Sequence, residues 1–155
     1  MDPIGEPLSF FGAPAEQPSL EWTWVDAQLR TAPTYWVVGR SSGAPHPRPV
    51  WGAWHQQRLL LSIGSPSLRA QLDRDPTATV HLDSGLDVVV VEARVEGKTS
   101  DPDAIAVYDV KYDWHYDAER YGPLFDLRPR RVLAWRAAGP AGRDGFVRAG
   151  RWRFE

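Results

Sequence analysis

The sequence predicts a mainly β protein, a β-barrel of six or seven short strands with short helices at its periphery. Short segments rich in β-branched and aromatic residues recur between turns made of Gly, Pro, Ser and Asp. The helical segments between them are few and short. With 155 residues, 43% of them hydrophobic, the chain can bury a core of its own. No internal repeat is visible, so residues 1–155 are interpreted as a single domain.

The N-terminal stretch differs from the rest in composition. Residues 1–18 contain four prolines, which remove backbone donors and restrict φ, so we expect an extended arm. Phe10 and Phe11 are candidates to anchor this arm. A helix is expected from about Ser19, a suitable N-cap residue. Its apolar face would consist of Trp22, Val25 and Leu29, which recur at helical spacing.

The next part of the chain predicts a hairpin, a third strand and a short helix. The expected strands are residues 35–40, 46–54 and 58–63, and the expected helix is 68–73. The second strand contains Pro47 and Pro49, which cannot donate to a strand ladder. It must therefore lie at an edge or lose its pairing locally.

The second half of the chain continues the same alternation. Expected strands are 77–82, 87–97, 124–127, 131–135 and 146–154, with a helix from Asp101 and a second short helix at 113–120. The segment 87–97 begins with four consecutive valines after Asp87, which indicates burial on both faces. Asp101 and Pro102 together favour the start of a helix. The strands 124–127 and 131–135 are expected to be separate, since Pro129 lies between them.

Several classes of protein are excluded or disfavoured by composition. Cysteine is absent, so the chain has no disulfide and no thiol nucleophile. No run of 18 apolar residues predicts a membrane span, and the N-terminus lacks the pattern of a signal peptide. These observations predict a soluble, cytoplasmic protein that does not bind a membrane.

Charge is distributed unevenly along the chain. Residues 1–119 carry 9 basic and 17 acidic side chains, whereas residues 120–155 carry 9 basic and 3 acidic ones. A basic tail is compatible with nucleic-acid binding. The preferred interpretation is that these arginines pair with the acidic remainder of the chain or with a bound anion, because they alternate with apolar residues. We therefore expect no nucleic-acid partner.

Some candidate chemical groups have a structural interpretation that is preferred. A cluster of possible metal ligands, Asp109, Asp113, His115 and Asp117, matches no known zinc spacing, and a solvated helix face explains it better. No metal site is therefore expected. His46 and His81 fall on expected strands, where a structural role in the core or in a cleft is favoured. No catalytic acid or base emerges from the sequence.

Two tryptophans on one expected strand are predicted to have different roles. Trp51 and Trp54 lie three residues apart, so their side chains should point to opposite faces of the strand. One is expected to pack in the core and the other to face a cleft. An aromatic ring beside a backbone that Pro49 leaves unpaired is suited to bind a planar ligand.

A candidate anion site is spread over the turns that follow these strands. Arg48 lies on the second strand, Ser62 ends the third, and Ser67 and Arg69 open the short helix. A helix N-terminus offers free N–H groups to an anion, and Arg binds phosphate with two donors at once. Surface capping and a surface arginine are the alternative, which the pattern alone does not exclude.

The run from Tyr35 to Gly97 resembles the pyridoxamine 5′-phosphate oxidase-like family, the flavin-binding split barrels. The strand order, the turns and the start of the short helix fall in register with that family, and the ending RWRF at 151–154 matches more weakly. The resemblance implies a split β-barrel of Greek-key type. It also implies that Arg48, Ser62, Ser67 and Arg69 bind the flavin phosphate. The isoalloxazine ring would lie against Pro49, Val50 and Trp51, close to Val88.

The resemblance also has departures that narrow the expected function. Leu68 and Ala53 stand where basic residues are common in the family, and the C-terminal substrate signature of the vitamin B6 oxidases is absent. The expected cofactor is therefore FMN or, alternatively, the deazaflavin coenzyme F420. The resemblance implies a homodimeric oxidoreductase that moves a hydride to or from a small organic substrate. A non-catalytic flavin-binding or sequestering protein on the same fold is the alternative.

Overall fold

Six antiparallel strands close into a barrel in the computed structural model, which describes residues 1–8 and 20–155. The strands are β2 (Tyr35–Gly39), β3 (Arg48–His55), β4 (Arg58–Ser62), β5 (Thr77–His81), β6 (Asp87–Thr99) and β7 (Leu124–Ala137). Around the barrel the order is β7–β4–β3–β2–β5–β6, and β6 pairs back to β7. The expected split-barrel class is confirmed.

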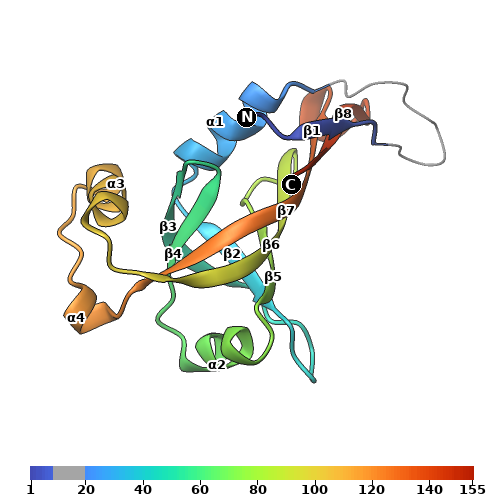
Figure 1. Cartoon of the computed structure of the whole chain (residues 1–155). Helices are drawn as coiled ribbons and strands as arrows, with labels where there is room; N and C mark the ends of the chain where they lie inside the picture. Colours follow the sequence, from blue (N-terminus) through green and yellow to red (C-terminus); the bar gives the residue numbers. More distant parts are fainter. Residues whose placement is uncertain (9–19) are drawn as a thin grey trace.

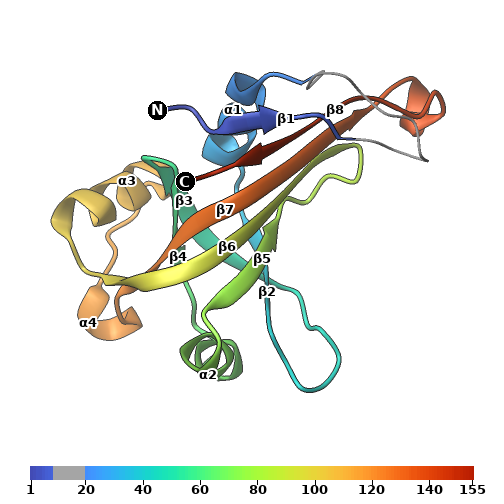
Figure 2. The ribbon, with the colours of Figure 1, turned by 45° about the vertical axis from the view of Figure 1, so that its right-hand side comes forward.

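Two more strands extend the sheet outside the barrel in the described part of the chain. β8 (Phe146–Arg153) pairs with the second half of β7, and β1 (Ile4–Glu6) pairs with the end of β8. The first half of β7 pairs instead with β4, so the strand beside β7 changes along its length from β4, in the barrel, to β8, outside it (Figure 2). Part of the expected N-terminal arm is thus a strand. Its anchors Phe10 and Phe11 lie outside the described residues.

The two strands expected around Pro129 form one continuous strand, so the predicted break is wrong. In β7 Pro129 lies opposite Ala93, Arg131 lies opposite Glu92, and Arg130 has no partner across the ladder. An extra residue on one strand is a β-bulge, where a proline without an N–H is tolerated. The bulge therefore allows the strand to continue through the proline.

Short helices surround the barrel, as expected. They are α1 (Trp22–Thr31), α2 (Pro66–Arg74), α3 (Pro102–Tyr112) and α4 (Ala118–Tyr121), with a 3₁₀ turn at Pro140–Gly142. Figure 1 shows α1 and α2 at opposite ends of the barrel, whereas α3 and α4 lie together at its side. None of the described helices is long and apolar enough to cross a membrane.

The helix boundaries correct two expectations. The first helix begins at Trp22 rather than near Ser19, which lies outside the described residues, and its N-cap Glu21 makes no side-chain cap. Its predicted apolar face is confirmed, because Trp22, Val25 and Leu29 are all buried. The second correction concerns the helix expected at 113–120. Asp113 has a left-handed backbone with φ of 47°, which ends α3, and only the last four residues before Gly122 are helical.

One of the two histidines expected on strands lies elsewhere. β3 begins at Arg48, so His46 lies in an exposed loop and not on a strand. His81 is on β5 as expected, and its ring stacks on that of Trp36 with the centroids 6.1 Å apart. Neither histidine is buried in the core.

The basic tail pairs with carboxylates from earlier in the chain, which confirms the preferred interpretation of its charge for six arginines. Arg128 and Arg130 face Glu96, Arg131 binds Glu92, Arg136 binds Asp87, and Arg151 and Arg153 both bind Glu6. Most of these pairs are partly exposed and therefore stabilise the fold only weakly. These six arginines share four carboxylates, so the pairs offset only part of the positive charge of the tail.

Candidate functional site

A pocket of about 470 Å³ lies where β3 and the β4–α2 turn face the segment that contains α3 and α4. The strand wall consists of Arg48, Pro49, Val50, Trp51, Ser62, Gly64 and Ser65, and the helix wall consists of Tyr108, Trp114, Tyr116 and Tyr121. Its volume falls in the range of small-molecule sites. Of the described residues that line it, Arg48 alone carries a full charge at neutral pH.

One end of the pocket is the N-terminus of α2. Ser65 caps this helix, because its Oγ accepts from the Leu68 N–H at 3.3 Å. Arg48 Nη2 donates to the Ser67 Oγ at 2.7 Å, and the hydroxyls of Ser65 and Ser67 lie 3.2 Å apart. A guanidinium, two hydroxyls and the N-terminus of a helix therefore meet at one point. Such an arrangement is suited to an anion.

Arg69, on the same helix, faces a different set of atoms. Its Nε donates to the Ile63 carbonyl at 2.5 Å and its Nη2 donates to the Tyr121 carbonyl at 2.8 Å. It is not among the residues that line the pocket. Arg69 thus ties the strand wall to the helix wall from behind the pocket. Leu68, which stands where the family often has a cation, is fully buried in the core.

The two tryptophans of β3 lie on opposite faces, as predicted. Trp54 is 2% exposed and donates from Nε1 to Asp26 at 2.7 Å, whereas Trp51 is 46% exposed and lines the pocket. The Trp51 ring stacks on Tyr112, with centroids 4.5 Å apart and planes 10° apart. Trp114 approaches the Trp51 ring edge-on at 6.2 Å.

The helix wall was not predicted from the sequence. Tyr116 holds it against the strand wall, since its hydroxyl donates to the Gly122 carbonyl at 2.9 Å and lies 3.3 Å from the Ser62 Oγ. The available signal was the density of aromatic residues between 108 and 121, with Tyr108, Tyr112 and Tyr116 four apart. Periodicity alone does not distinguish a core face from a pocket wall.

Two phenols of α3, Tyr108 in the helix wall and Tyr112 behind Trp51, have shifted pKa values. Burial raises the pKa of Tyr108 well above its usual value, and the neighbouring Tyr112 adds to this effect. Burial also raises the pKa of Tyr112. Phenols with raised pKa values remain protonated and serve as hydrogen-bonding aromatic surfaces. Tyr108 and Tyr112 therefore offer shape and stacking rather than a base.

The structure brings together most of the site residues expected from the sequence. Arg48, Pro49, Val50, Trp51 and Ser62 line the pocket directly. Ser67 joins them through its bond to Arg48, and Arg69 lies behind them. Val88 does not join them, because it is half-buried on β6, opposite Trp135 of β7.

Two members of the cluster of possible metal ligands, Asp109 and Asp117, have structural roles. Asp109 Oδ1 accepts from the Tyr116 N–H at 2.8 Å, and Asp117 caps α4. Among the residues that the structure describes, no group of three or more His, Cys, Asp or Glu side chains is placed to hold a metal ion.

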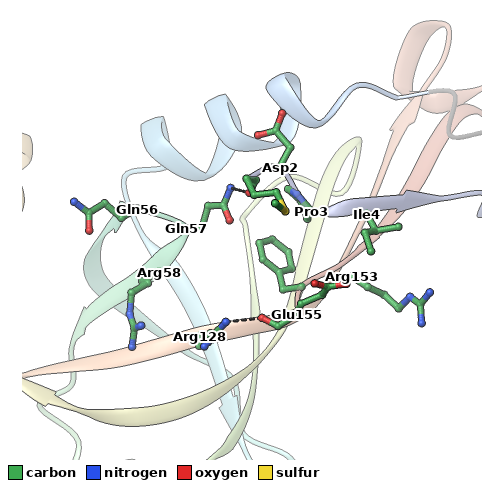
Figure 3. A pocket seen from close by; sticks show the side chains of 11 residues that line it. Asp2, Pro3, Ile4, Gln56, Gln57, Arg58, Arg128, Arg153 and Glu155 are labelled. Carbon is green, nitrogen blue, oxygen red and sulfur yellow. Dashed lines mark hydrogen bonds between the residues drawn. The ribbon is translucent and has the colours of Figure 1, made fainter.

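A second pocket of about 470 Å³ lies between the two ends of the described chain, beside the β3–β4 turn. Figure 3 shows Gln57, Arg58 and Arg128 around it. Arg58 binds Asp126 at 2.6 Å, and Arg128 donates to the Glu155 carbonyl. Its arginines are therefore already bound to the protein's own oxygens, and it lacks the helix N-terminus that the first pocket has.

Comparison with known proteins finds similarity at the level of structure only. No family model and no curated protein matches the chain. An F420 reductase has a TM-score of 0.56 at 16% identity, covering 69% of this chain and 94% of its own. A candidate pyridoxamine 5′-phosphate oxidase from Listeria innocua has a TM-score of 0.59 at 14% identity, covering 72% and 95%. A FAD-binding protein from Mesorhizobium loti has a TM-score of 0.56 at 15% identity, covering 96% and 97%.

These similarities confirm, at the level of fold, the resemblance seen in the sequence. The chain has the split-barrel fold of the pyridoxamine 5′-phosphate oxidase-like flavin and deazaflavin proteins. Identities of 14–16% show this shared fold and do not transfer an activity.

Proposed function

We propose that this protein binds a phosphate-bearing flavin or deazaflavin, FMN or coenzyme F420, in the pocket between the strand wall and the helix wall. The observation that carries the proposal is that one pocket combines a cationic, hydroxyl-bearing end with aromatic walls. Arg48 and the serines at the N-terminus of α2 form one end, and five aromatic side chains line the remainder. A phosphate and a planar ring on one molecule require such a combination.

The phosphate would lie at the end of the pocket next to α2. Arg48 would bind it directly, with Ser62 and Ser67 contributing hydroxyl groups. The α2 N-terminus favours negative charge through its dipole and the Ser67 N–H, since Pro66 has no N–H and the Leu68 and Arg69 N–H groups are bonded to Ser65. Arg69 lies behind this end and would add positive charge from there, although two of its donors already face carbonyl groups.

The ring would lie along β3, against Pro49, Val50 and the free face of Trp51. The other face of Trp51 is covered by Tyr112, which leaves one side for a ligand. Val88, implied by the resemblance to lie near the ring, does not line the pocket of its own chain. We therefore propose a homodimer in which Val88 of a second copy approaches the ring.

For the protein with its cofactor bound, we favour the function of an oxidoreductase that moves a hydride between the cofactor and a small organic substrate. The cofactor supplies the redox chemistry, while the chain binds it, orients it and excludes water. The alternative is a protein that binds or sequesters a flavin without turnover. One observation favours this alternative: burial raises the pKa values of Tyr108 and Tyr112, so these two phenols stay protonated and offer no base for proton transfer.

Titration of the purified protein with FMN, riboflavin and coenzyme F420 tests the proposal. We expect FMN or F420 to bind, riboflavin to bind more weakly than FMN because it lacks the phosphate, and mass spectrometry to identify any ligand released on denaturation. Binding of none of the three would overturn the proposal. Reduction of the bound cofactor followed by turnover with an acceptor would separate the enzyme from the non-catalytic alternative.

A further inference from the structure

The edge of β3 that faces β2 loses its neighbouring strand at the pocket. Pairing between the two strands ends at Tyr35 and Val50, and the chain before Tyr35 is the turn that contains Pro33. Gly52, two residues further along β3, is buried and lies beyond the end of this pairing, so it has no partner on β2. A buried peptide group without partners would be costly.

Two side chains of α3 take the place of the missing strand. The Gly52 N–H donates to the Tyr112 hydroxyl at 2.9 Å, and Lys111 Nζ donates to the Gly52 carbonyl at 2.7 Å. The Tyr112 hydroxyl lies 2.8 Å from the Pro33 carbonyl and 2.9 Å from the Gly52 carbonyl, one of which accepts its proton. The N–H and the carbonyl of Gly52 thus both form hydrogen bonds to side chains of α3.

The same two side chains fix the aromatic rings at the pocket. The Tyr112 ring supports Trp51, and Lys111 Nζ lies 4.5 Å from the Tyr35 ring centroid and 5.1 Å from that of Tyr112. The strand wall and the helix wall are therefore joined at Gly52, next to Trp51 in the sequence.

Lys111 occupies this position without an acidic partner in the described part of the chain. The groups that face it are the Tyr35 hydroxyl of β2, at 3.0 Å, and the Tyr112 ring, while Arg30 of α1 acts on Tyr35 from further away. Burial lowers its pKa from 10.5 to about 8. A half-buried cation without a carboxylate carries a desolvation cost, which its bonds to Gly52 and Tyr35 offset in part.

We propose that Lys111 and Tyr112 are positioning residues of the ligand pocket, which replace the missing strand at Gly52 and so hold Trp51 and the helix wall at a fixed separation. This proposal rests on the proposed function, because it assigns the two residues a role in binding the same flavin-type ligand. Neither side chain lines the pocket, so both act through Trp51 and through α3. A pre-positioned pocket binds more tightly because less freedom is lost on binding.

Two substitutions and one matched control test the proposal. Tyr112→Phe keeps the ring that supports Trp51 and removes the hydroxyl, and Lys111→Met keeps the aliphatic stem and removes the donor. Val110→Ala on the same helix is the control, since Val110 is 85% exposed. We expect each test variant to weaken FMN or F420 by about two- to tenfold, because the lost bonds act on the ligand only through Trp51 and α3. The control should bind as the wild type does.

Amide hydrogen exchange provides a readout that needs no ligand. Tyr112→Phe should accelerate exchange at the Gly52 N–H, whereas the N–H of Leu61 on β4 should exchange as before. Unchanged Gly52 exchange in this variant would overturn the proposal, and so would loss of stability in both variants with unchanged ligand affinity. If wild-type protein binds no flavin while Gly52 exchange responds as expected, the proposed function fails and the contact at Gly52 stands.

Discussion

The two walls of the pocket are held in place by different kinds of contact. The strand wall belongs to the closed barrel, where backbone hydrogen bonds to neighbouring strands fix its position. The helix wall is attached through a few side chains: Tyr112 and Lys111 at Gly52, Tyr116 at Ser62, and Arg69 at the Tyr121 carbonyl. Two of its residues, Tyr108 and Tyr116, form a small separate cluster of buried residues with Leu60 and Leu124.

This difference in attachment indicates that the two walls contribute to ligand binding in different ways. The strand wall supplies the charge of Arg48 on a rigid support, so a change there should affect one chemical group of the ligand. The helix wall supplies aromatic surface on a support that single side chains maintain. A change in those attachments should alter the shape of the whole pocket, and hence the binding of any ligand that fits it.

The largest expected effect is a difference in stability between substitutions on the two faces of β3. Trp54→Ala should lower the free energy of unfolding by ~3–5 kcal/mol, because it empties a buried site and leaves Asp26 without its indole partner. Trp51→Ala should lower it by less than ~1 kcal/mol, because its ring is half exposed, but should weaken ligand binding. Urea unfolding of both variants measures this. Equal losses would contradict the assignment of one ring to the core and the other to the pocket.

The second comparison concerns an arginine that lines the pocket, Arg48, and one that links its two walls, Arg69. Arg48→Ala should weaken FMN by about ten- to a hundredfold, since a charged hydrogen bond contributes ~1.5–3 kcal/mol. Riboflavin has no phosphate, so its affinity for this variant should change little. Arg69→Ala should weaken both ligands, because Arg69 also holds the helix wall at Tyr121. Calorimetric titration of both variants with both ligands measures this, and equal loss of FMN and riboflavin in Arg48→Ala would contradict a phosphate contact.

The smallest expected effect is the pH dependence contributed by Lys111. Its pKa is about 8 in the folded protein and 10.5 in the unfolded chain, so the unfolded state holds more protons between these values. The free energy of unfolding should therefore rise as the pH increases from 8 to 10.5. Partial exposure reduces the effect to ~1 kcal/mol. Lys111→Met should lack this rise, so the difference in the free energy of unfolding between the wild type and this variant should increase from pH 8 to 10.5. Parallel pH profiles of the two proteins would contradict the prediction.

The sequence predicted the strand wall because its signals are local. Alternating side chains place Trp51 and Trp54 on opposite faces, and the turn after Ser62 leads directly into the N-terminus of α2. The helix wall could not be predicted in the same way. Ser62 and Tyr116 are 54 residues apart, and nothing in their spacing indicates that they meet. The continuity of β7 through Pro129 depends on a bulge opposite β6, which local sequence also does not reveal.

The resemblance placed Arg69 and Val88 at the ligand, but packing within one chain gives them other surroundings. Arg69 faces two carbonyl groups because the segment 114–122 folds over the β4–α2 turn. Val88 lies on a strand that does not reach the pocket. The proposed role of Val88 therefore depends on a second copy of the chain, which light scattering tests. The proposed role of Arg69 depends on an indirect effect, which the Arg69→Ala titration tests.

A crystal structure of the protein with FMN or coenzyme F420 tests the central claim most directly. We predict the phosphate at hydrogen-bond distance from Arg48 and Ser67, beside the α2 N-terminus, and the ring between Trp51 and the helix wall. A ligand bound instead in the pocket between the chain ends, beside Arg58 and Arg128, would contradict the account.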